Sequence, residues 1–280
     1  MFIFKTVEDV GTYLRKRKAQ NTAVGFIPTM GALHQGHLSL IDAAKQEEML
    51  TVCSIFVNPT QFNNSSDLEK YPRSTGEDIE MLAEAGCDVL FVPEEKEIYP
   101  EGKVNKEPYD LGYLDTVLEG ASRPGHFQGV AQVVDRLLQI VAPNTMYLGQ
   151  KDFQQCAVLQ RLIDLKHPSV TLKKVPTMRE ADGLAMSSRN RRMTEPQRSL
   201  AGLLYQCLVS IQVKNGMQSF QVVKKECWDI LIHKGFKPEY IELADASTLE
   251  LLSEYDTSRK MVALIAAYIG DIRLIDNMEL

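Results

Sequence analysis

The first two-thirds of the chain alternate short apolar runs with segments whose apolar residues recur at helical spacing, and this alternation strongly constrains the fold. The strand-like runs cover residues 23–28, 51–57, 89–92, 145–148 and 170–175. The helical segments between them cover residues 38–49, 77–85, 130–141 and 153–165. Strands that alternate with helices predict an α/β fold built on a doubly wound parallel sheet with right-handed crossovers.

The pattern changes after about residue 176. Two longer helical segments and two strand-like segments follow, at residues 195–214, 219–233, 240–244 and 261–269. We therefore predict two domains: a Rossmann-like domain over residues 1–176 and a smaller C-terminal α+β domain over residues 177–280.

Composition and charge narrow the classes of partner. The chain has 31 Lys and Arg residues against 37 Asp and Glu residues, a net charge of −6 that is unlike a nucleic-acid-binding protein. Its longest apolar run, residues 261–269, is much shorter than the ~20 residues that span a bilayer, and the N-terminus lacks signal-peptide features. Its five cysteines are scattered, which is typical of reduced thiols. We expect a cytoplasmic protein that binds neither nucleic acid nor a membrane.

Two histidines stand where the first buried strand passes into a helix. Ligands of doubly wound sheets bind beyond the carboxyl ends of the strands, so His34 and His37 lie in the expected region. Residues three apart share a helix face, and a helix N-terminus attracts anions. Gly31 and Gly36 let a phosphate approach the backbone. The pair predicts a phosphate site; the alternative is one capping and one packed histidine.

Two further strand ends carry polar side chains. Asn58 and Gln61 suit a hydroxyl or carboxylate substrate, with an ordinary Asn-Pro turn as the alternative. Lys151 opposes the dipole of the helix that it opens, which is understandable if it faces an anionic ligand; otherwise it is a surface lysine. Asp152 is the expected N-cap of that helix, and Gln155 shares its face with Asp152.

Two loops outside these strand ends offer anion-binding groups. In residues 179–190, a turn at 182–183 precedes the hydroxyl and guanidinium donors of 187–189, which match phosphate oxygens. This loop lies near the predicted domain boundary, where a flap closes over a nucleotide in many enzymes. Arg123 and His126 are weaker candidates for a carboxylate or phosphate.

The order of these motifs resembles a known family. The sequence His-x-Gly-His after the first buried strand and the later Met-Ser-Ser-Arg loop resemble the HIGH and KMSKS signatures of the nucleotidylyltransferase superfamily. Within it, the chain resembles the pantothenate synthetases, or pantoate–β-alanine ligases. The resemblance is carried, in family order, by PTMGALHQGH (28–37), VNPTQF (57–62), YPR (71–73), RPGHFQGV (123–130), GQKDFQQ (149–155), READGLAMSSRN (179–190) and RLIDN (273–277).

The resemblance implies a homodimeric, cytoplasmic, ATP-dependent ligase whose smaller domain acts as a lid. The pantoate carboxylate would attack the α-phosphorus of ATP to give pantoyl adenylate and pyrophosphate. The amine of β-alanine would then release pantothenate and AMP. The family uses ATP with Mg²⁺ and no tightly bound organic cofactor. No loop offers an activated Ser or Cys with a base partner, which fits this noncovalent route.

The resemblance also assigns residues. Its ATP-binding set is Met30, Gly31, Ala32, Leu33, His34, Gln35, Gly36, His37, Gly149, Gln150, Lys151, Asp152, Met178, Met186, Ser187, Ser188 and Arg189. Catalytic roles fall to His34, His37, Lys151 and Arg189, with His37 as the proton donor. Pantoate and β-alanine would be held by Gln61 and Gln155, with Asn58, Arg123 and His126 as secondary candidates. Glu77 and Asp78 are candidate Mg²⁺ contacts, or else acidic residues of a first helical turn.

Two rival functions remain open. Another small-molecule nucleotidylyltransferase of the same fold would release a nucleotidyl product without consuming an amine. A nucleotide-binding regulatory protein would keep the fold without turnover; the presence of His34, His37, Lys151 and Arg189 argues against it.

Overall fold

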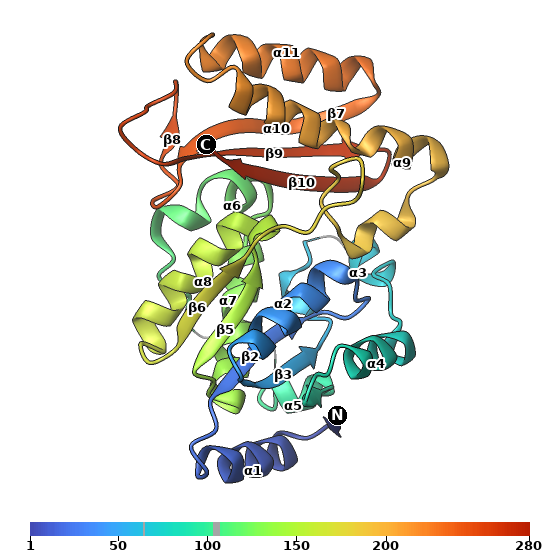
Figure 1. Ribbon diagram of the computed structural model, residues 1–280, viewed down its shortest axis with the longest axis vertical. Coiled ribbons are helices and arrows are strands. Elements are labelled where there is room, and N and C mark those ends of the chain that lie inside the picture. Colours follow the sequence, from blue (N-terminus) through green and yellow to red (C-terminus); the bar gives the residue numbers. More distant parts are fainter. Residues whose placement is uncertain (64, 103–106) are drawn as a thin grey trace. The chain divides into compact units, whose positions relative to one another are not determined.

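The computed structural model describes residues 1–63, 65–102 and 107–280, and its first sheet contains six parallel strands (Figure 1). Their spatial order is β1 (Phe2–Phe4), β4 (Val89–Phe91), β3 (Leu50–Ile55), β2 (Val24–Thr29), β5 (Thr145–Gly149) and β6 (Thr171–Val175). The strand order reverses between β2 and β5, so the loops after these two strands lie where doubly wound sheets bind ligands.

The central strands are buried on both faces, as parallel strands covered by helices usually are. All residues of β3 are buried, as are the first four of β2. The longer helices associated with this sheet are α2 (Gln35–Gln46), α4 (Thr75–Glu84), α7 (His126–Val141) and α8 (Phe153–Lys166). One apolar cluster joins Ile27 of β2, Ile41 of α2 and Leu82 of α4. This cluster packs α2 and α4 against the strands that they connect.

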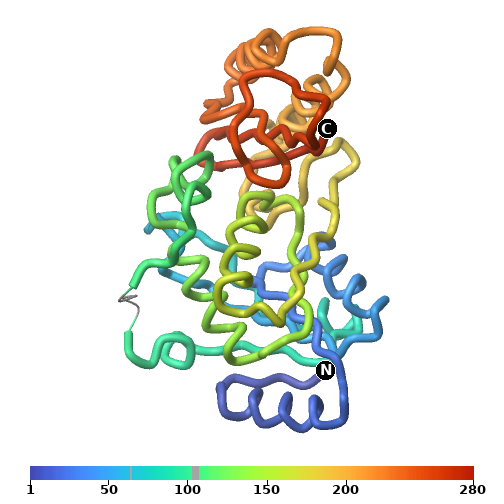
Figure 2. The backbone as a smooth tube through the Cα atoms, turned by 90° about the vertical axis from the view of Figure 1, so that its left-hand side faces the viewer, coloured from blue at the N-terminus to red at the C-terminus, as the bar shows by residue number. Residues whose placement is uncertain are grey.

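Shorter elements complete this part of the chain. Helix α1 (Val7–Lys18) starts at the N-cap Thr6, ends in four basic residues that suit the helix dipole, and contacts β1 (Figure 2). The remaining short helices are η1 (Pro59–Gln61), α3 (Ser65–Glu69), α5 (Glu95–Ile98), η2 (Gly112–Asp115), α6 (Leu118–Ser122) and η3 (Gln150–Asp152). No helix among the described residues is long and apolar enough to cross a bilayer.

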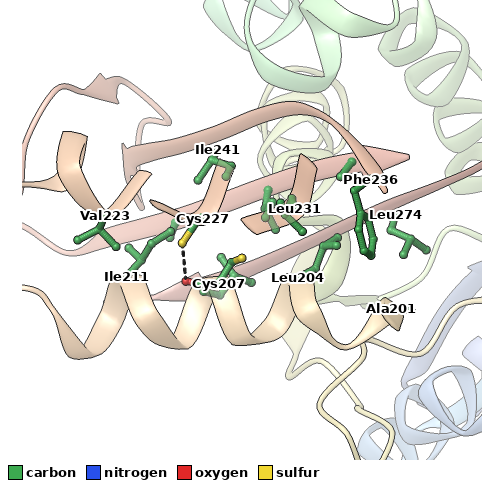
Figure 3. Packing of buried hydrophobic residues seen from close by; sticks show 14 of the residues in the cluster. Ala201, Leu204, Cys207, Ile211, Val223, Cys227, Leu231, Phe236, Ile241 and Leu274 are labelled. Atoms are coloured by element: carbon green, nitrogen blue, oxygen red, sulfur yellow. Dashed lines mark hydrogen bonds between the residues drawn. The ribbon is translucent and has the colours of Figure 1, made fainter. Parts of the chain in front are cut away.

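The second sheet is antiparallel and has the order β10 (Ile272–Glu279), β9 (Met261–Ile269), β7 (Phe236–Asp245) and β8 (Leu251–Leu252). It is accompanied by η4 (Ser188–Arg192), α9 (Glu195–Ala201), α10 (Leu203–Val213) and α11 (Phe220–His233). Figure 3 shows the apolar core of this part, in which Cys207 of α10 and Cys227 of α11 face each other. Here the thiol of Cys227 donates a hydrogen bond to the Cys207 carbonyl at 3.7 Å.

The chain separates into two compact units. The first consists of Met1–Gln150 and Val158–Pro176, and the second of Lys151–Ala157 and Thr177–Leu280. Lys151 and the first turn of α8 therefore belong to the second unit, although the rest of α8 belongs to the first.

The predicted fold class is confirmed: a Rossmann-like α/β sheet and a smaller α+β part. One predicted helix, residues 195–214, was wrong as a single element, because the structure has α9 and α10 with Gly202 between them. A Cβ on Gly202 would lie 3.0 Å from the carbonyl oxygen of Asp182, which is closer than most Cβ contacts, so a larger residue here would have to displace its neighbour slightly. The sequence prediction also did not include β1, β8 and β10.

Candidate active site

The turn after β2 presents both histidines at the N-terminus of α2. His34 is the N-cap, and its Nδ1 accepts a hydrogen bond from the N–H of Gly36 at 3.2 Å. In return, Nδ1 of His37 accepts from the N–H of His34 at 3.3 Å, which completes a reciprocal capping box. The two ring centroids are 4.1 Å apart. The capping function that was the alternative for these residues is therefore observed.

This capping arrangement selects the tautomer of each neutral ring. A ring nitrogen that accepts from a backbone N–H carries no proton, so the proton of neutral His34 and His37 is on Nε2. Nε2–H is a hydrogen-bond donor, which is the function needed to bind a phosphate oxygen. Capping and phosphate binding thus use different nitrogens of the same ring and are compatible.

The backbone before the helix has an unusual conformation. Gly31 and Ala32 both have left-handed φ angles, +77° and +50°. A Cβ on Gly31 would lie 2.9 Å from Oδ2 of Asp78, so glycine is needed there for space as well as for its φ angle. The carboxylate of Asp78, on α4, accepts the N–H groups of Ala32 at 2.9 Å and Leu33 at 2.8 Å. The candidate metal ligand Asp78 therefore binds the backbone of the histidine turn.

A second group of predicted residues surrounds Gln61. Asn58 is only 1% exposed, and its amide group donates to the side-chain oxygen of Gln61 and to the carbonyl of Gly129, both at 3.1 Å. Its own oxygen accepts from the hydroxyl of Tyr99 at 2.7 Å. Burial raises the pKa of Tyr99 to about 12, so this hydroxyl remains a donor at neutral pH. Asn58 thus orients Gln61, whose nitrogen donates to the Met30 sulfur at 3.1 Å.

Arg123 and His126 contact the backbone of the same glutamine. Nδ1 of His126 is 2.8 Å from the Gln61 carbonyl oxygen, and a guanidinium nitrogen of Arg123 donates to that oxygen at 3.3 Å. Because a carbonyl only accepts, Nδ1 of His126 carries the proton and Nε2 faces Arg123 at 3.2 Å. Gly129 permits this packing, since its Cβ would lie 2.4 Å from the Thr60 carbonyl oxygen. The predicted substrate residues of the first unit therefore form one cluster.

The loop after β5 carries the predicted lysine. In η3 the Nζ of Lys151 lies 3.5 Å from Oδ1 of Asp152, and the side chain of Lys151 is 19% exposed. Gln155 is half-buried on the first turn of α8. The amide group of Asn277 donates to the carbonyl of Lys151 at 2.8 Å, so β10 fixes the backbone of this short turn.

The predicted flap, residues 179–190, lies in a hairpin-like loop of the second unit. The N–H of Met186 donates to the Met178 carbonyl at 3.0 Å, which brings these two predicted ATP contacts together. At its tip Gly183 has a φ of +87° and packs against the ring of Tyr205. The hydroxyl of Ser187 then caps η4 by accepting from the N–H of Arg189 at 3.3 Å. Ser188 is buried, whereas Arg189 is only half-buried.

Residues whose roles the sequence did not indicate support these groups. Thr29 accepts from the N–H of Gly31 at 3.2 Å and donates to the Ser54 carbonyl at 2.8 Å, linking the histidine turn to β3. Asp276 and Asn277 hold the hairpin and the Lys151 turn from β10. Both residues belong to the family motif RLIDN, so the sequence marked this segment, but the motif alone did not indicate what its side chains do.

The remaining predicted residues are placed as follows. Gln35 is exposed and Gly36 half-buried at the start of α2, and Gly149 and Gln150 are half-buried after β5. Glu77 is exposed on the first turn of α4. Among the described residues, no three His, Cys, Asp or Glu side chains are grouped so that they could hold a metal ion.

A doubly wound sheet with polar loops at the point where strand order reverses places the chain in the Rossmann-like α/β class, whose members bind ligands at this edge of the sheet. A family model described as pantoate–β-alanine ligase matches residues 2–279. The chain therefore belongs to the pantoate–β-alanine ligase family, and its predicted enzyme class, a ligase, is confirmed.

Relatives support this assignment over the whole chain. A pantothenate synthetase of Azobacteroides pseudotrichonymphae is 43% identical over 280 residues, covering 99% of both proteins. The crystal structure of pantothenate synthetase from Thermus thermophilus is 38% identical with a TM-score of 0.90, covering 99% of both chains. A pantoate–β-alanine ligase from Francisella tularensis, complexed with β-γ ATP and β-alanine, is 37% identical with a TM-score of 0.82; the match covers 99% of this chain and 97% of that one.

Proposed function

We propose that this chain condenses pantoate with β-alanine at the expense of ATP, giving pantothenate, AMP and pyrophosphate. The observation that carries the proposal is the histidine pair at the N-terminus of α2, in which the capping box leaves a proton on Nε2 of each ring. Two such donors at the positive end of a helix suit the negative charge of a triphosphate.

The reaction has two steps. A pantoate carboxylate oxygen attacks the α-phosphorus of ATP, the bond to the bridging oxygen breaks, and pyrophosphate leaves with pantoyl adenylate remaining. The β-alanine amine then attacks the acyl carbon, loses a proton and expels AMP. All five cysteines are buried, which favours this route over a covalent thioester. Catalysis consists mainly of positioning and charge stabilisation.

Roles follow for the residues of each unit. His34 and His37 donate to phosphate oxygens, and His37 donates a proton to the leaving pyrophosphate. Gln61, oriented by Asn58, binds the pantoate hydroxyl and borders the β-alanine site. From the second unit, Lys151 and Arg189 stabilise the charge that develops on the triphosphate.

The wider binding sets are also part of this proposal. ATP contacts would come from residues 30–37, 149–152, 178 and 186–189, and Gln155 would bind pantoate with Gln61. Arg123 and His126 support the site through the Gln61 carbonyl. The second unit would close over ATP as a lid. The protein would act as a cytoplasmic homodimer.

Mg²⁺ would be held mainly by the ATP phosphates, since it keeps several waters and takes few protein ligands. When bound, it would neutralise charge on the departing pyrophosphate. The exposed carboxylate of Glu77 suits an outer contact with a hydrated ion. Asp78 suits it less, because both of its oxygens accept backbone N–H groups.

An assay that omits each substrate in turn tests the function. We expect AMP to appear only when ATP, pantoate and β-alanine are all present under multiple turnover. AMP release that is indifferent to β-alanine would remove the assignment. A nucleotidyl product formed without any amine would favour the other nucleotidylyltransferase reaction.

Variants of His37 test the proton donor separately from the cap. His37→Ala should lower kcat by a factor on the order of 10² or more. His37→Gln keeps an acceptor at the third helical position, so it should preserve helix capping yet lose a similar amount of activity. A fall of only a few-fold in His37→Gln would rule out the proton-donor role.

A further inference from the structure

The carboxylate of Asp78 is a buried group that the reaction itself does not use. Asp78 lies on the first turn of α4 and is 1% exposed. Its two oxygens accept from consecutive backbone amides, Oδ2 from Ala32 at 2.9 Å and Oδ1 from Leu33 at 2.8 Å. The hydroxyl of Ser74 adds a third hydrogen bond, to Oδ1, at 3.2 Å. Such charge-assisted bonds are among the stronger ones in proteins.

The backbone that Asp78 holds would not adopt its conformation readily by itself. Gly31 and Ala32 are consecutive left-handed residues, and alanine disfavours that region. The N–H groups of Ala32 and of the next residue, Leu33, both point toward the carboxylate of Asp78 and donate to it. The contact therefore offsets the conformational cost of the turn.

The turn is directly continuous with the histidines. Leu33, whose N–H is bound by Asp78, is buried and precedes the N-cap His34. The direction in which the chain leaves Leu33 determines where α2 begins and hence where both imidazoles lie. A shift of about 1 Å in a catalytic group can lower a rate by roughly 10²-fold.

We propose that Asp78 is a positioning residue: by binding the N–H groups of Ala32 and Leu33 it fixes the left-handed turn that orients His34 and His37. This inference rests on the proposed function, because its kinetic test uses the adenylation of pantoate. It differs from the role of a metal ligand, in which the carboxylate would act on Mg²⁺ and not on the backbone.

Asp78→Asn is the informative substitution. It keeps the size of the side chain but replaces one acceptor oxygen with an NH₂ group, which cannot accept from a backbone N–H. One of the two backbone amides then loses its hydrogen bond to this side chain. Glu80→Gln makes the same chemical change on an exposed position of the same helix and is the matched control.

The first measurement does not need catalysis. Hydrogen exchange of the peptide containing residues 31–34 is followed in the wild type, Asp78→Asn and Glu80→Gln. We expect exchange in Asp78→Asn to be at least tenfold faster than in the other two. Unchanged exchange would overturn the proposal. If the wild type lacks ligase activity, the proposed function fails, but this measurement still decides whether Asp78 holds the turn.

The second measurement separates the two chemical steps. We expect Asp78→Asn to slow single-turnover adenylation of pantoate on the order of 10²-fold. Aminolysis of added pantoyl adenylate by β-alanine should change less than threefold, since no triphosphate is bound in that step. Equal losses in both steps would indicate general structural damage and overturn the positioning role.

A double variant and the Mg²⁺ dependence of the rate distinguish a positioning role from a metal-binding role. Ala32→Gly makes the left-handed conformation easier, so the adenylation rate lost in Asp78→Asn should recover several-fold in the double variant.

The Mg²⁺ concentration for half-maximal rate should be the same in the wild type and Asp78→Asn. A tenfold rise in that concentration, with no recovery by Ala32→Gly, would instead assign Asp78 to the metal. If Asp78→Asn does not fold, the milder Ser74→Ala should show the same pattern to a smaller degree.

Discussion

Arg179 forms a bidentate ion pair with Asp276, which lies 97 residues further along the chain. The two N···O distances are 2.6 Å and 3.0 Å, and the side chain of Asp276 is 3% exposed. Burial raises the pKa of Asp276, although the guanidinium of Arg179 opposes that change. Arg179 also donates to the carbonyls of Gly183 and Asn277. The motifs READG and RLIDN thus meet in one contact.

Removal of this pair should strongly destabilise the second unit. Asp276→Ala leaves the Arg179 guanidinium without its buried partner, so we expect the free energy of unfolding to fall by about 3 kcal/mol. The fluorescence of Trp228, the single tryptophan, follows urea unfolding of this unit. Asp229→Ala, which breaks the exposed pair with Lys225, should cost less than about 1 kcal/mol. If both substitutions lowered the free energy of unfolding equally, the buried pair would stabilise the unit no more than the exposed pair does.

A methyl group at Gly129 should disturb the Gln61 cluster. The added Cβ would lie 2.4 Å from the Thr60 carbonyl oxygen, so α7 and η1 must separate. We expect Gly129→Ala to lower stability by about 1–3 kcal/mol and to raise the KM for pantoate more than that for ATP. Gly76→Ala, where nothing lies within 4 Å, is the control and should leave both constants unchanged. An unchanged KM for pantoate in Gly129→Ala would show that the packing of α7 against η1 does not affect substrate binding.

Capping and phosphate binding by His34 should be separable. Asparagine is a good N-cap, so His34→Asn should retain the stability of α2, whereas His34→Ala should lose about 1 kcal/mol. Both variants lack the Nε2–H donor and should lose roughly tenfold to a hundredfold in kcat/KM for ATP. Thermal unfolding and steady-state kinetics of the two variants provide the measurements. Full activity in His34→Asn would leave capping as the only function of this histidine.

Acid should destabilise the turn after β7 in a defined pH range. Hydrogen bonds from the Ser247 hydroxyl and from the backbone N–H groups of Ser247 and Thr248 lower the pKa of Asp245 from 3.8 to about 2. The unfolded chain then binds the proton more readily than the folded chain. The stabilisation is therefore complete above pH ~4 and is lost as the pH falls through about 2. The stability difference between wild type and Asp245→Asn should shrink over this range in urea titrations; a constant difference would contradict the lowered pKa.

The apolar pattern of the sequence predicted the strands that are buried along most of their length. Strands β2, β3 and β5 are apolar runs with both faces covered, so the sequence alone located them to within one or two residues. Strand β1 has only three residues, and two of them are exposed at the sheet edge. Strand β10 contains Asp276 and Asn277, which are polar in sequence but buried through their contacts with Arg179 and Lys151. Such partners cannot be inferred from local pattern.

The candidate site shows the same division. Chemical type and position at a strand end selected His34, His37 and Gln61 from sequence, because parallel strands place their following loops at one edge. The atoms that each residue uses depend on distant partners. Asn58 is turned inward by Tyr99, 41 residues away, and Asp78 is engaged by a turn 45 residues earlier. Side-chain direction therefore required the structure.

The burial of every thiol provides a chemical probe of local opening. Cys53 and Cys87 lie in the first unit, while Cys156, Cys207 and Cys227 lie in the second. Burial also raises the pKa of Cys53 and Cys87, which further suppresses the reactive thiolate. A thiol reagent at neutral pH can therefore modify the protein only when a unit opens. Mass spectrometry of the labelled peptides would time the opening of each unit separately in the native enzyme, without any engineered reporter.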